Sequence, residues 1–469
     1  MSRILFELRL ILKNSAFLIL LISYFIILLL ATSFGINRYQ HEIKQIEQSA
    51  SYFTENKSAW KNKDSLSPGM AAYYIFEPAV FTPSLWSALF HGERKEQLTQ
   101  QRIRILSIHS QIYGNPVTNK THLSIGRLDA SFIWLYLMPL VIGLISVTCI
   151  ADERRLERWP LISSVTESRA RFILYRLSAR FLLILLFNSL TLVIASISLS
   201  IPLNQTSIYI FGILFLYQLF WFLVSGIVIV LNKNAVQSLL LFISFWLISV
   251  FVIPGIYYLQ KLESQSVNTG IELLMTQRQL MNDSWDNDQQ SDFNQFIAKH
   301  PQWKNQSRTI KPGDWDWYYA MQKESDNKVS QLANTYHEQQ LNTQSIWLWL
   351  SPTLTIQNEL ETIASTSSRS YIHYRQQIIQ WHQQLQNFWF PYLFLDKPFQ
   401  PQDLDNVPPF NYQNSYQGSN VALIYFFLLN LAILFIAARW YKIRYFYDVM
   451  PSIDNPLSKK LSLATNRVK

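Results

Sequence analysis

Six long apolar stretches, separated by polar segments of very uneven length, set the pattern of this chain. Each is close to the roughly 20 residues that a helix needs to cross a bilayer. None carries Asp, Glu, Lys, Arg or His in its interior, and a charge at the centre of a span costs about 2.5–3.5 kcal/mol. The pattern predicts transmembrane helices at residues 15–36, 131–151, 181–202, 208–231, 236–258 and 421–438.

The first stretch follows Arg3, Arg9 and Lys13 and could be mistaken for a signal peptide. Its apolar core is longer than the roughly 7–15 residues of a signal peptide, so we expect an uncleaved anchor. The third to fifth spans are joined by very short loops and form one block, residues 181–258.

Two long segments, 37–130 and 259–420, separate the first span from the second and the fifth from the sixth. Loops of this length rarely lack structure of their own, so each should be a folded insertion. Residues 37–63 are spaced as in an amphipathic helix, whereas 67–86 combine Pro, Gly and aromatic residues, as in an irregular or short-strand segment. We therefore expect an all-α polytopic membrane protein with a mainly helical domain built from two insertions.

The second insertion is rich in Gln and Asn. Two of its stretches, 325–345 and 355–389, have the length and the lack of Pro and Gly typical of long helices. The acidic run 282–292 lacks the Gly and Glu that an EF-hand calcium loop requires and is interpreted as a solvated loop. In the later stretch, apolar residues recur every three to four positions with occasional skips and predict one packed face, made of Ile363, Tyr371, Tyr374, Ile378, Trp381 and Leu385.

Positive charge gathers in the short segments. Residues 1–14, 151–180, 231–236 and 439–469 hold 18 of the 40 Lys and Arg but only 7 of the 31 Asp and Glu. This is the positive-inside pattern, which predicts that both termini are cytoplasmic and that both insertions are extracytoplasmic. The pI of about 9.3 then reflects topology and gives no evidence for a nucleic-acid partner.

Few residues offer catalytic or metal-binding chemistry. The single cysteine, Cys149, excludes an internal disulfide and a thiolate cluster. No nucleotide-binding G-x-x-x-x-G-K-[ST] loop, H-E-x-x-H pair or G-x-S-x-G elbow occurs. The eight histidines lie singly along the chain, with His373 and His382 nine residues apart on one predicted helix. We expect no catalytic residue, no metal site and no cofactor bound by this chain.

The spans contain only mild polar residues, and Asn188, Gln218 and Asn430 are candidates for a substrate path. Hydrogen bonding between helices is the simpler interpretation, and we favour it. Ion-coupled carriers usually keep ionisable residues near the bilayer midplane. Their absence predicts that energy is supplied from outside the spans.

The segment 151–176, between the second and third spans, carries six arginines and four acids. Residues 153–165 join a charged half to an apolar half, as in a short helix at the membrane surface, and the arginines of 167–181 suit the headgroup level. These charges could serve only to set the topology. A short rigid helix between two spans is equally what an energy-supplying cytoplasmic partner would push on, and the basic amphipathic segment 1–14 would lie beside it.

These features resemble the permease subunits of ABC-2-type ABC transporters. Members of that family have an amphipathic N-terminal helix, six spans, and a coupling helix between spans two and three that docks onto the ATPase. Their coupling segment begins Glu-Arg, continues through Gly-Thr-Leu and ends near a basic residue. Glu153 and Arg154 match the opening, Arg176 matches the closing residue, and Leu161, Ile162 and Val165 match the apolar positions.

Glu157, Arg158 and Trp159 stand where that family has Gly-Thr-Leu, so the match departs from the family pattern there. The resemblance implies that residues 152–180 are a coupling segment. Its ATPase interface would comprise Glu153, Arg154, Glu157, Arg158, Trp159, Leu161, Ile162, Val165 and Arg176.

A narrower similarity is to members with large insertions after spans one and five, a group catalogued as a domain of unknown function. Residues 115–145 resemble its Asn-Pro … Gly-x-x-Asp-x-x-Phe … Leu-x-Pro-Leu pattern, and 349–366 and 407–413 resemble its second insertion. Asp129 begins the second span, where we expect its carboxylate to cap the helix rather than to take part in catalysis.

The resemblance implies a multi-pass permease in a bacterial cytoplasmic (inner) membrane. Its partners would be the lipid bilayer, a separate ABC ATPase that holds ATP and Mg, and a second permease, either the same chain or a close relative. Two functions stay open: transport of a substrate, most simply export, or strokes that drive a periplasmic partner without transport. A membrane enzyme with its site in 259–420 is disfavoured, because no acid, His or nucleophile cluster is visible there.

Overall fold

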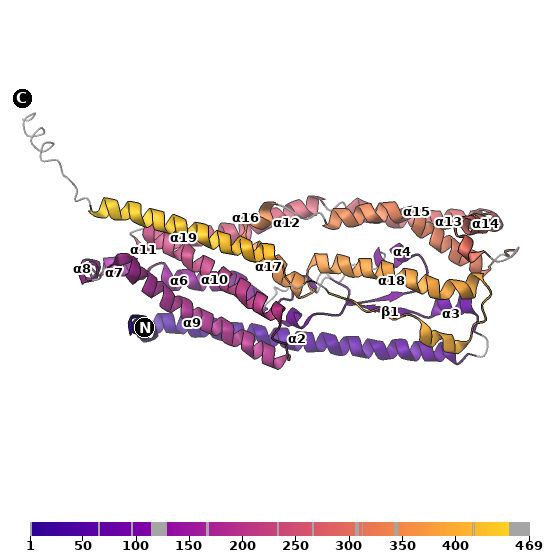
Figure 1. Cartoon of the computed structure of the whole chain (residues 1–469), viewed down its shortest axis with the longest axis horizontal. Coiled ribbons are helices and arrows are strands. Elements are labelled where there is room, and N and C mark those ends of the chain that lie inside the picture. Colours follow the sequence, from indigo (N-terminus) through magenta and orange to yellow (C-terminus); the bar gives the residue numbers. More distant parts are fainter. Residues whose placement is uncertain are drawn as a thin grey trace, which may run out of the picture.

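The computed structural model is a long, mostly helical molecule with a helical bundle at one end and a second lobe at the other (Figure 1). The helix α2 (Ser15–Lys61), in indigo, runs the length of both parts. The structure describes residues 2–63, 66–94, 97–113, 129–165, 168–231, 234–264, 267–304, 309–311, 313–341, 346–414, 416 and 418–449.

Among these residues, six helical segments are long and apolar enough to cross a membrane: 15–61, 130–155, 169–198, 205–231, 235–260 and 420–440. The prediction of a helical membrane protein is confirmed at this level. The segments consist of α2; α5 (Ala130–Phe132), η4 (Ile133–Leu137), α6 (Met138–Ser146) and α7 (Cys149–Arg155); α9 (Arg169–Ser198); α10 (Gln205–Leu231); α11 (Ala235–Leu247), η5 (Ile248–Val252) and α12 (Ile253–Ser264); and α19 (Asn420–Val449).

The helix α10 lies at the centre of the bundle and packs against α6, α9, α11 and α19. Tyr217 and Trp221 on α10 are completely buried, whereas α11 and α19 expose apolar side chains outward, as a bilayer requires. At Gly143 a Cβ atom would lie 2.2 Å from the ring of Phe242, so the glycine lets α6 and α11 approach closely.

The helix α2 continues unbroken for 47 residues, which is about 70 Å at 1.5 Å per residue. The sequence predicts a span at 15–36 and an amphipathic helix over 37–63, and the structure joins the two. Asn14 caps the helix by accepting from the backbone N–H groups of Ala16 and Phe17. The bundle and the second lobe therefore share one rigid rod.

The second lobe, here called the distal lobe, comprises residues 37–113, 267–341 and 368–414. Its strands β1 (Glu77–Val80) and β2 (Gln100–Ile103) pair antiparallel, with Glu77 opposite Ile103. Its other elements are α3 (Pro68–Tyr74), α4 (Ile108–Tyr113), α13 (Val267–Asp286), α14 (Gln289–Lys299), η6 (Pro301–Trp303), α15 (Trp315–Leu341), α18 (Ser368–Phe394) and η7 (Pro401–Asn406).

The two insertions build a single core in the distal lobe. Phe81 from the first insertion stacks on Tyr374 from the second, with ring centroids 4.7 Å apart, and Trp317 is buried in the same cluster. The irregular or short-strand segment predicted for 67–86 corresponds to α3, β1 and η1 (Leu85–Ala88) with extended backbone between them. The helix predicted for 325–345 is α15, which begins earlier and ends at Leu341.

The prediction of a single helix over 355–389 is wrong. The helix α17 (Pro352–Ile363) ends, Ser365 has a φ of +59°, and α18 begins at Ser368. The hydroxyl of Ser367 accepts from the backbone N–H of Ser370 and starts α18, which shows how a Ser/Thr run competes with helix continuation. The predicted packed face survives on α18, where Tyr374, Ile378, Trp381 and Leu385 are buried and Tyr371 is half-buried; Ile363 is buried but belongs to α17.

The acidic run 282–292 is also not a loop. It forms the end of α13 and the start of α14, and Asp288 caps α14 by accepting from the backbone N–H of Ser291 at 3.0 Å. An acid at a helix start is stabilised by the helix dipole, which accounts for Asp288 and Asp292 at α14 but not for Asp283 and Asp286 at the end of α13.

The Asp129 cap is confirmed. One carboxylate oxygen accepts from the backbone N–H of Phe132 at 2.8 Å, and the other accepts from the backbone N–H of His91 at 3.1 Å. Asp129 thus starts the second candidate span and ties it to the segment after η1. Residues 115–128 of the motif that precedes it lie outside the described residues, as does most of the predicted tail, 450–469.

Candidate functional site

The interspan link, residues 149–176, lies at the end of the bundle away from the distal lobe (Figure 1). A turn at 156–158 separates α7 from the short helix α8 (Trp159–Val165), and α9 begins behind Ser168, which caps it. The helix α1 (Ser2–Lys13) packs against α9 at the same end. A short helix does lie between the spans, but α8 covers only the apolar half of the predicted segment 153–165; the charged half forms the end of α7 and the turn.

Arg176 holds the interspan link together. Its guanidinium donates to the Cys149 carbonyl at 2.7 Å and to the Glu153 carboxylate at 2.8 Å, and it lies 3.4 Å from the Glu7 carboxylate. All three charged side chains are at least 87% shielded from solvent. We call this set the Arg176 cluster; it joins α1, α7 and α9, so Glu153 and Arg176 are turned inward.

The surface of the link carries a different set of the predicted residues. Leu161 and Val165 on α8 are 69% and 77% exposed, and Glu157 and Arg158 are exposed beside them. Ile162 is half-buried, and Trp159 packs against Phe172 with Arg154 over its ring at 5.4 Å. Of the predicted interface, the part available to a partner is the outer face of α8 and the turn before it.

Glu157 has a φ of +57°, the left-handed backbone that favours glycine and costs another residue about 1 kcal/mol. It stands where the coupling pattern that this segment resembles has glycine. We expect Glu157→Gly to stabilise the protein by about 0.5–1 kcal/mol, measured as a higher midpoint of thermal unfolding in detergent. Glu157→Ala is the control, because it removes the same carboxylate and keeps the Cβ; an equal gain in both variants would contradict the strain.

The candidate substrate-path residues hydrogen-bond within the bundle. Asn188 accepts from the Tyr24 hydroxyl at 2.7 Å and the Trp134 indole at 3.2 Å, and it donates to Gln218 at 3.0 Å. Gln218 donates in turn to the Phe181 carbonyl at 2.9 Å. Asn430 donates to the carbonyls of α10 and its own helix, at Leu216 and Phe426. These contacts are the interhelical bonding that we favour, and the role in a substrate path stays a prediction.

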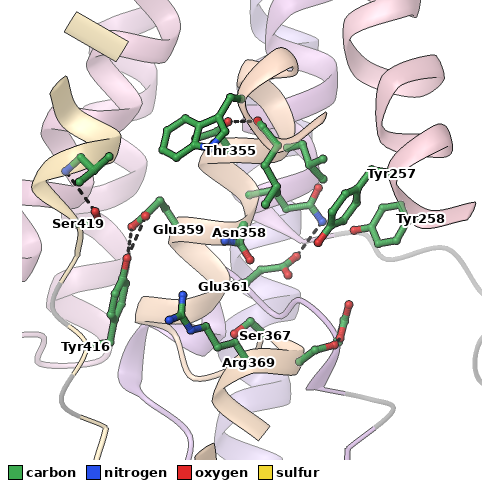
Figure 2. Close-up of a pocket in the computed structure, with 17 residues that line it drawn as sticks. Tyr257, Tyr258, Thr355, Asn358, Glu359, Glu361, Ser367, Arg369, Tyr416 and Ser419 are labelled. Atoms are coloured by element: carbon green, nitrogen blue, oxygen red, sulfur yellow. Dashed lines mark hydrogen bonds between the residues drawn. The ribbon is translucent and has the colours of Figure 1, made fainter. Parts of the chain in front are cut away.

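A cavity of about 420 Å³ lies where the bundle meets the distal lobe, around α17 and the break that follows it. Tyr257 and Tyr258 on α12 line it, as do Tyr416 and Ser419 just before α19. Trp349 on α16 (Ile346–Leu350) also lines it, with its ring packed on Tyr425 of α19. We call it the α17 pocket. Figure 2 shows Glu359 turned toward Tyr416 and Glu361 turned toward the two α12 tyrosines.

Three carboxylates and one guanidinium line the α17 pocket. Glu359, 9% exposed, accepts from the Tyr416 hydroxyl at 2.8 Å and lies 3.1 Å from the Tyr209 hydroxyl. Glu361, 7% exposed, accepts from the Gln357 amide at 2.8 Å. Glu93 contacts the Ser368 hydroxyl, and Arg369 is exposed at the edge. Burial raises the pKa of Glu359, while hydrogen bonds from Tyr416 and Tyr209 act against that shift.

Sequence reasoning missed this pocket because its parts are far apart in the chain. Glu93 is more than 260 positions from Ser368. Gly92, at a φ of +50°, lets the two segments approach closely, because a Cβ there would lie 2.7 Å from the Thr366 hydroxyl and 2.9 Å from Glu361. The sole local signal was "QNELE" at 357–361, whose two acids stand two positions apart on a helix next to a Ser/Thr run.

The sequence suggests that the histidines are isolated, but three of them lie close together. His109, His337 and His382 line one small cavity of about 220 Å³ in the distal lobe, with Lys323 and Asp326. Burial lowers the pKa of His382 to about 3 and of the other two to about 4, so all three are neutral near pH 7. Burial raises the pKa of Asp326 to about 7. Among the described residues, no group of three or more His, Cys, Asp or Glu has the arrangement to hold a metal ion.

Comparison with known families matches residues 271–413 to a domain of unknown function, DUF3526. That region extends from α13 to the segment after η7 and includes α17 and α18, so it supplies most of the distal lobe and part of the α17 pocket. No curated protein and no solved structure matches the chain.

Proposed function

We propose that this chain is the permease subunit of an ABC-2-type ABC transporter in a bacterial inner membrane. The ATPase is a separate subunit, and a second permease, identical or related, completes the complex. The termini and the interspan link face the cytoplasm, the distal lobe lies outside, and the substrate is exported.

One observation carries the proposal. The interspan link is a short helix with an exposed apolar face, Leu161 and Val165, held by the buried Arg176 cluster to α1, α7 and α9. A force applied to α8 is therefore transmitted to two candidate spans at once, because buried ion pairs with good geometry resist displacement. An unsupported loop would absorb the same force.

A second function is favoured by a separate observation. Because α2 is unbroken from the bundle to the far end of the distal lobe, tilting the bundle moves the lobe as one body. The hydrogen bonds of Asn188 and Gln218, all made within the bundle, also hold its helices together. A permease of this kind could drive a periplasmic partner without moving a substrate through its spans.

The test is purification of the tagged chain from its own bacterium in mild detergent, with identification of co-eluting proteins and an ATP-hydrolysis assay. We expect a stoichiometric ATPase subunit. In the double variant Leu161→Asp/Val165→Asp, ATP turnover should fall at least about tenfold, because two carboxylates enter an apolar contact and each tenfold corresponds to about 1.4 kcal/mol.

The matched control is Leu203→Asp. Leu203 is 92% exposed in the short connection between α9 and α10, at the opposite end of these spans. Both variants should keep the wild-type yield and unfolding temperature, since exposed substitutions rarely affect stability. A wild-type preparation without an ATPase subunit and without ATP turnover would overturn the proposal.

A further inference from the structure

We propose that the α17 pocket binds the ammonium group of a small amphiphilic or zwitterionic ligand, such as an aminoalcohol phosphate or the headgroup that carries it in a phospholipid. This proposal goes beyond the permease function and does not depend on an ATPase partner. It rests on the charge, the walls and the position of one cavity.

Among the described residues that line the pocket, three are acidic and one is basic. Glu359 and Glu361 are more than nine-tenths shielded, and Glu93 lies beside them, whereas Arg369 is exposed at the edge. Among the described residues, Glu359 forms no ion pair: its direct partners are the neutral hydroxyls of Tyr416 and Tyr209, and the more distant charge of Arg369 also acts on it. A shielded carboxylate whose direct hydrogen-bond partners are neutral still gains from a cation brought into contact with it.

The walls of the pocket suit an organic ammonium rather than a bare metal ion. Four aromatic rings line it, from Tyr257, Tyr258, Trp349 and Tyr416, and aromatic faces attract ammonium groups. The volume of about 420 Å³ lies in the range of small-molecule sites and far exceeds the space for a single ion. A site lined by aromatic rings and shielded carboxylates favours an alkylated nitrogen over a bare metal ion.

The position of the pocket brings it to a membrane surface. Tyr257 and Tyr258 end the fifth candidate span, and Val421 begins the sixth. Trp349, Tyr258 and Val421 are 47%, 42% and 58% exposed at the rim, which is the aromatic and apolar composition of a bilayer interface. A ligand can therefore enter from solution or from the lipid surface.

Arg369 supplies the second half of the recognition. Among the described residues it forms no ion pair, although its charge acts on Glu359, and Figure 2 shows it below Glu359 and Glu361. Arginine pairs with phosphate through parallel hydrogen bonds. A zwitterion would place its ammonium among Glu359, Glu361 and the rings, and its phosphate at Arg369.

The experiment uses the full chain in detergent and isothermal titration with phosphoethanolamine, with glycerol phosphate as the ligand that lacks the ammonium. We expect binding of phosphoethanolamine alone. Glu359→Gln and Glu361→Gln should each weaken it about tenfold or more, and Arg369→Gln should weaken it as well while leaving ethanolamine binding unchanged. Glu77→Gln is the matched control, because Glu77 is similarly shielded but lies on β1, outside the pocket.

A parallel arm distinguishes the two sources of the ligand. The unfolding temperature is measured in nanodiscs of phosphatidylethanolamine or phosphatidylglycerol. Stabilisation by phosphatidylethanolamine that is lost in Glu359→Gln identifies a lipid headgroup; binding of the soluble ligand without such stabilisation identifies a free amine. Equal affinity for both soluble ligands together with equal unfolding temperatures in both lipids, or unchanged binding in the Glu359→Gln and Glu361→Gln variants, would overturn the proposal.

Discussion

Replacing Arg176 by alanine is expected to destabilise the protein by about 3–5 kcal/mol, the largest effect of any substitution proposed for this chain. The guanidinium joins the carboxylates of Glu7 and Glu153 and the carbonyl of Cys149. Without it, the shielded Glu7 carboxylate loses its cation, and Glu153 keeps only the exposed Arg158, at 3.1 Å. The measurement is the midpoint of thermal unfolding in detergent, followed by size-exclusion chromatography.

Arg155→Ala is the matched control. Arg155 lies on the same link, but its side chain is 75% exposed and its contact with Asp152 is long, at 3.8 Å. Exposed pairs contribute about 0–1 kcal/mol, so this variant should resemble the wild type. The triple variant Arg176→Met/Glu7→Gln/Glu153→Gln should recover part of the loss, because it removes the two carboxylates that lost the Arg176 cation. Equal stability of the Arg176→Ala and Arg155→Ala proteins would refute the role of the cluster.

Replacing Asn188 by leucine is expected to cost about 2–4 kcal/mol. The substitution leaves the hydroxyl of Tyr24, the indole N–H of Trp134 and the amide oxygen of Gln218 without their common partner. Each lost bond costs about 1 kcal/mol, whether in a buried protein interior or between membrane helices. The readout is again thermal unfolding in detergent.

Thr191→Val on the same helix is the comparison. Thr191 is fully buried, but its hydroxyl donates only to the Phe187 carbonyl of its own helix at 2.9 Å, so a valine of the same shape should be nearly neutral. If Asn188 acted chiefly on a substrate, its leucine variant would keep the stability of the Thr191→Val protein and lose only activity. That result would reopen the substrate path.

Glu153 and Arg176 show how the meaning of a sequence signal changes with its structural surroundings. Both residues match a coupling pattern, which predicts a contact with a partner, yet they turn inward and hold the interspan link in place. Leu161 and Val165, matched only as apolar positions, are the exposed ones. Variants at Glu153 would therefore test stability first, whereas variants on the outer face of α8 test partner binding directly.

Local chemistry explains what the sequence determined by itself. Span positions follow from uninterrupted apolar runs, because backbone and side chains within about 20 residues decide whether a helix can enter a bilayer. The Asp129 cap follows from a carboxylate three residues before a free backbone N–H, and the packed face of α18 follows from its spacing of three to four residues. These signals need no distant partner.

Contacts between remote segments decided the rest. The distal-lobe core joins Phe81 to Tyr374, and the α17 pocket joins Glu93 to Glu361, across more than 260 positions in each case. The break at Ser365 depends on Thr366, whose hydroxyl donates to the distant Phe90 carbonyl at 2.8 Å. Such contacts form only when the whole chain packs, and their free energy overrides local helix propensity, so no window of sequence contains them.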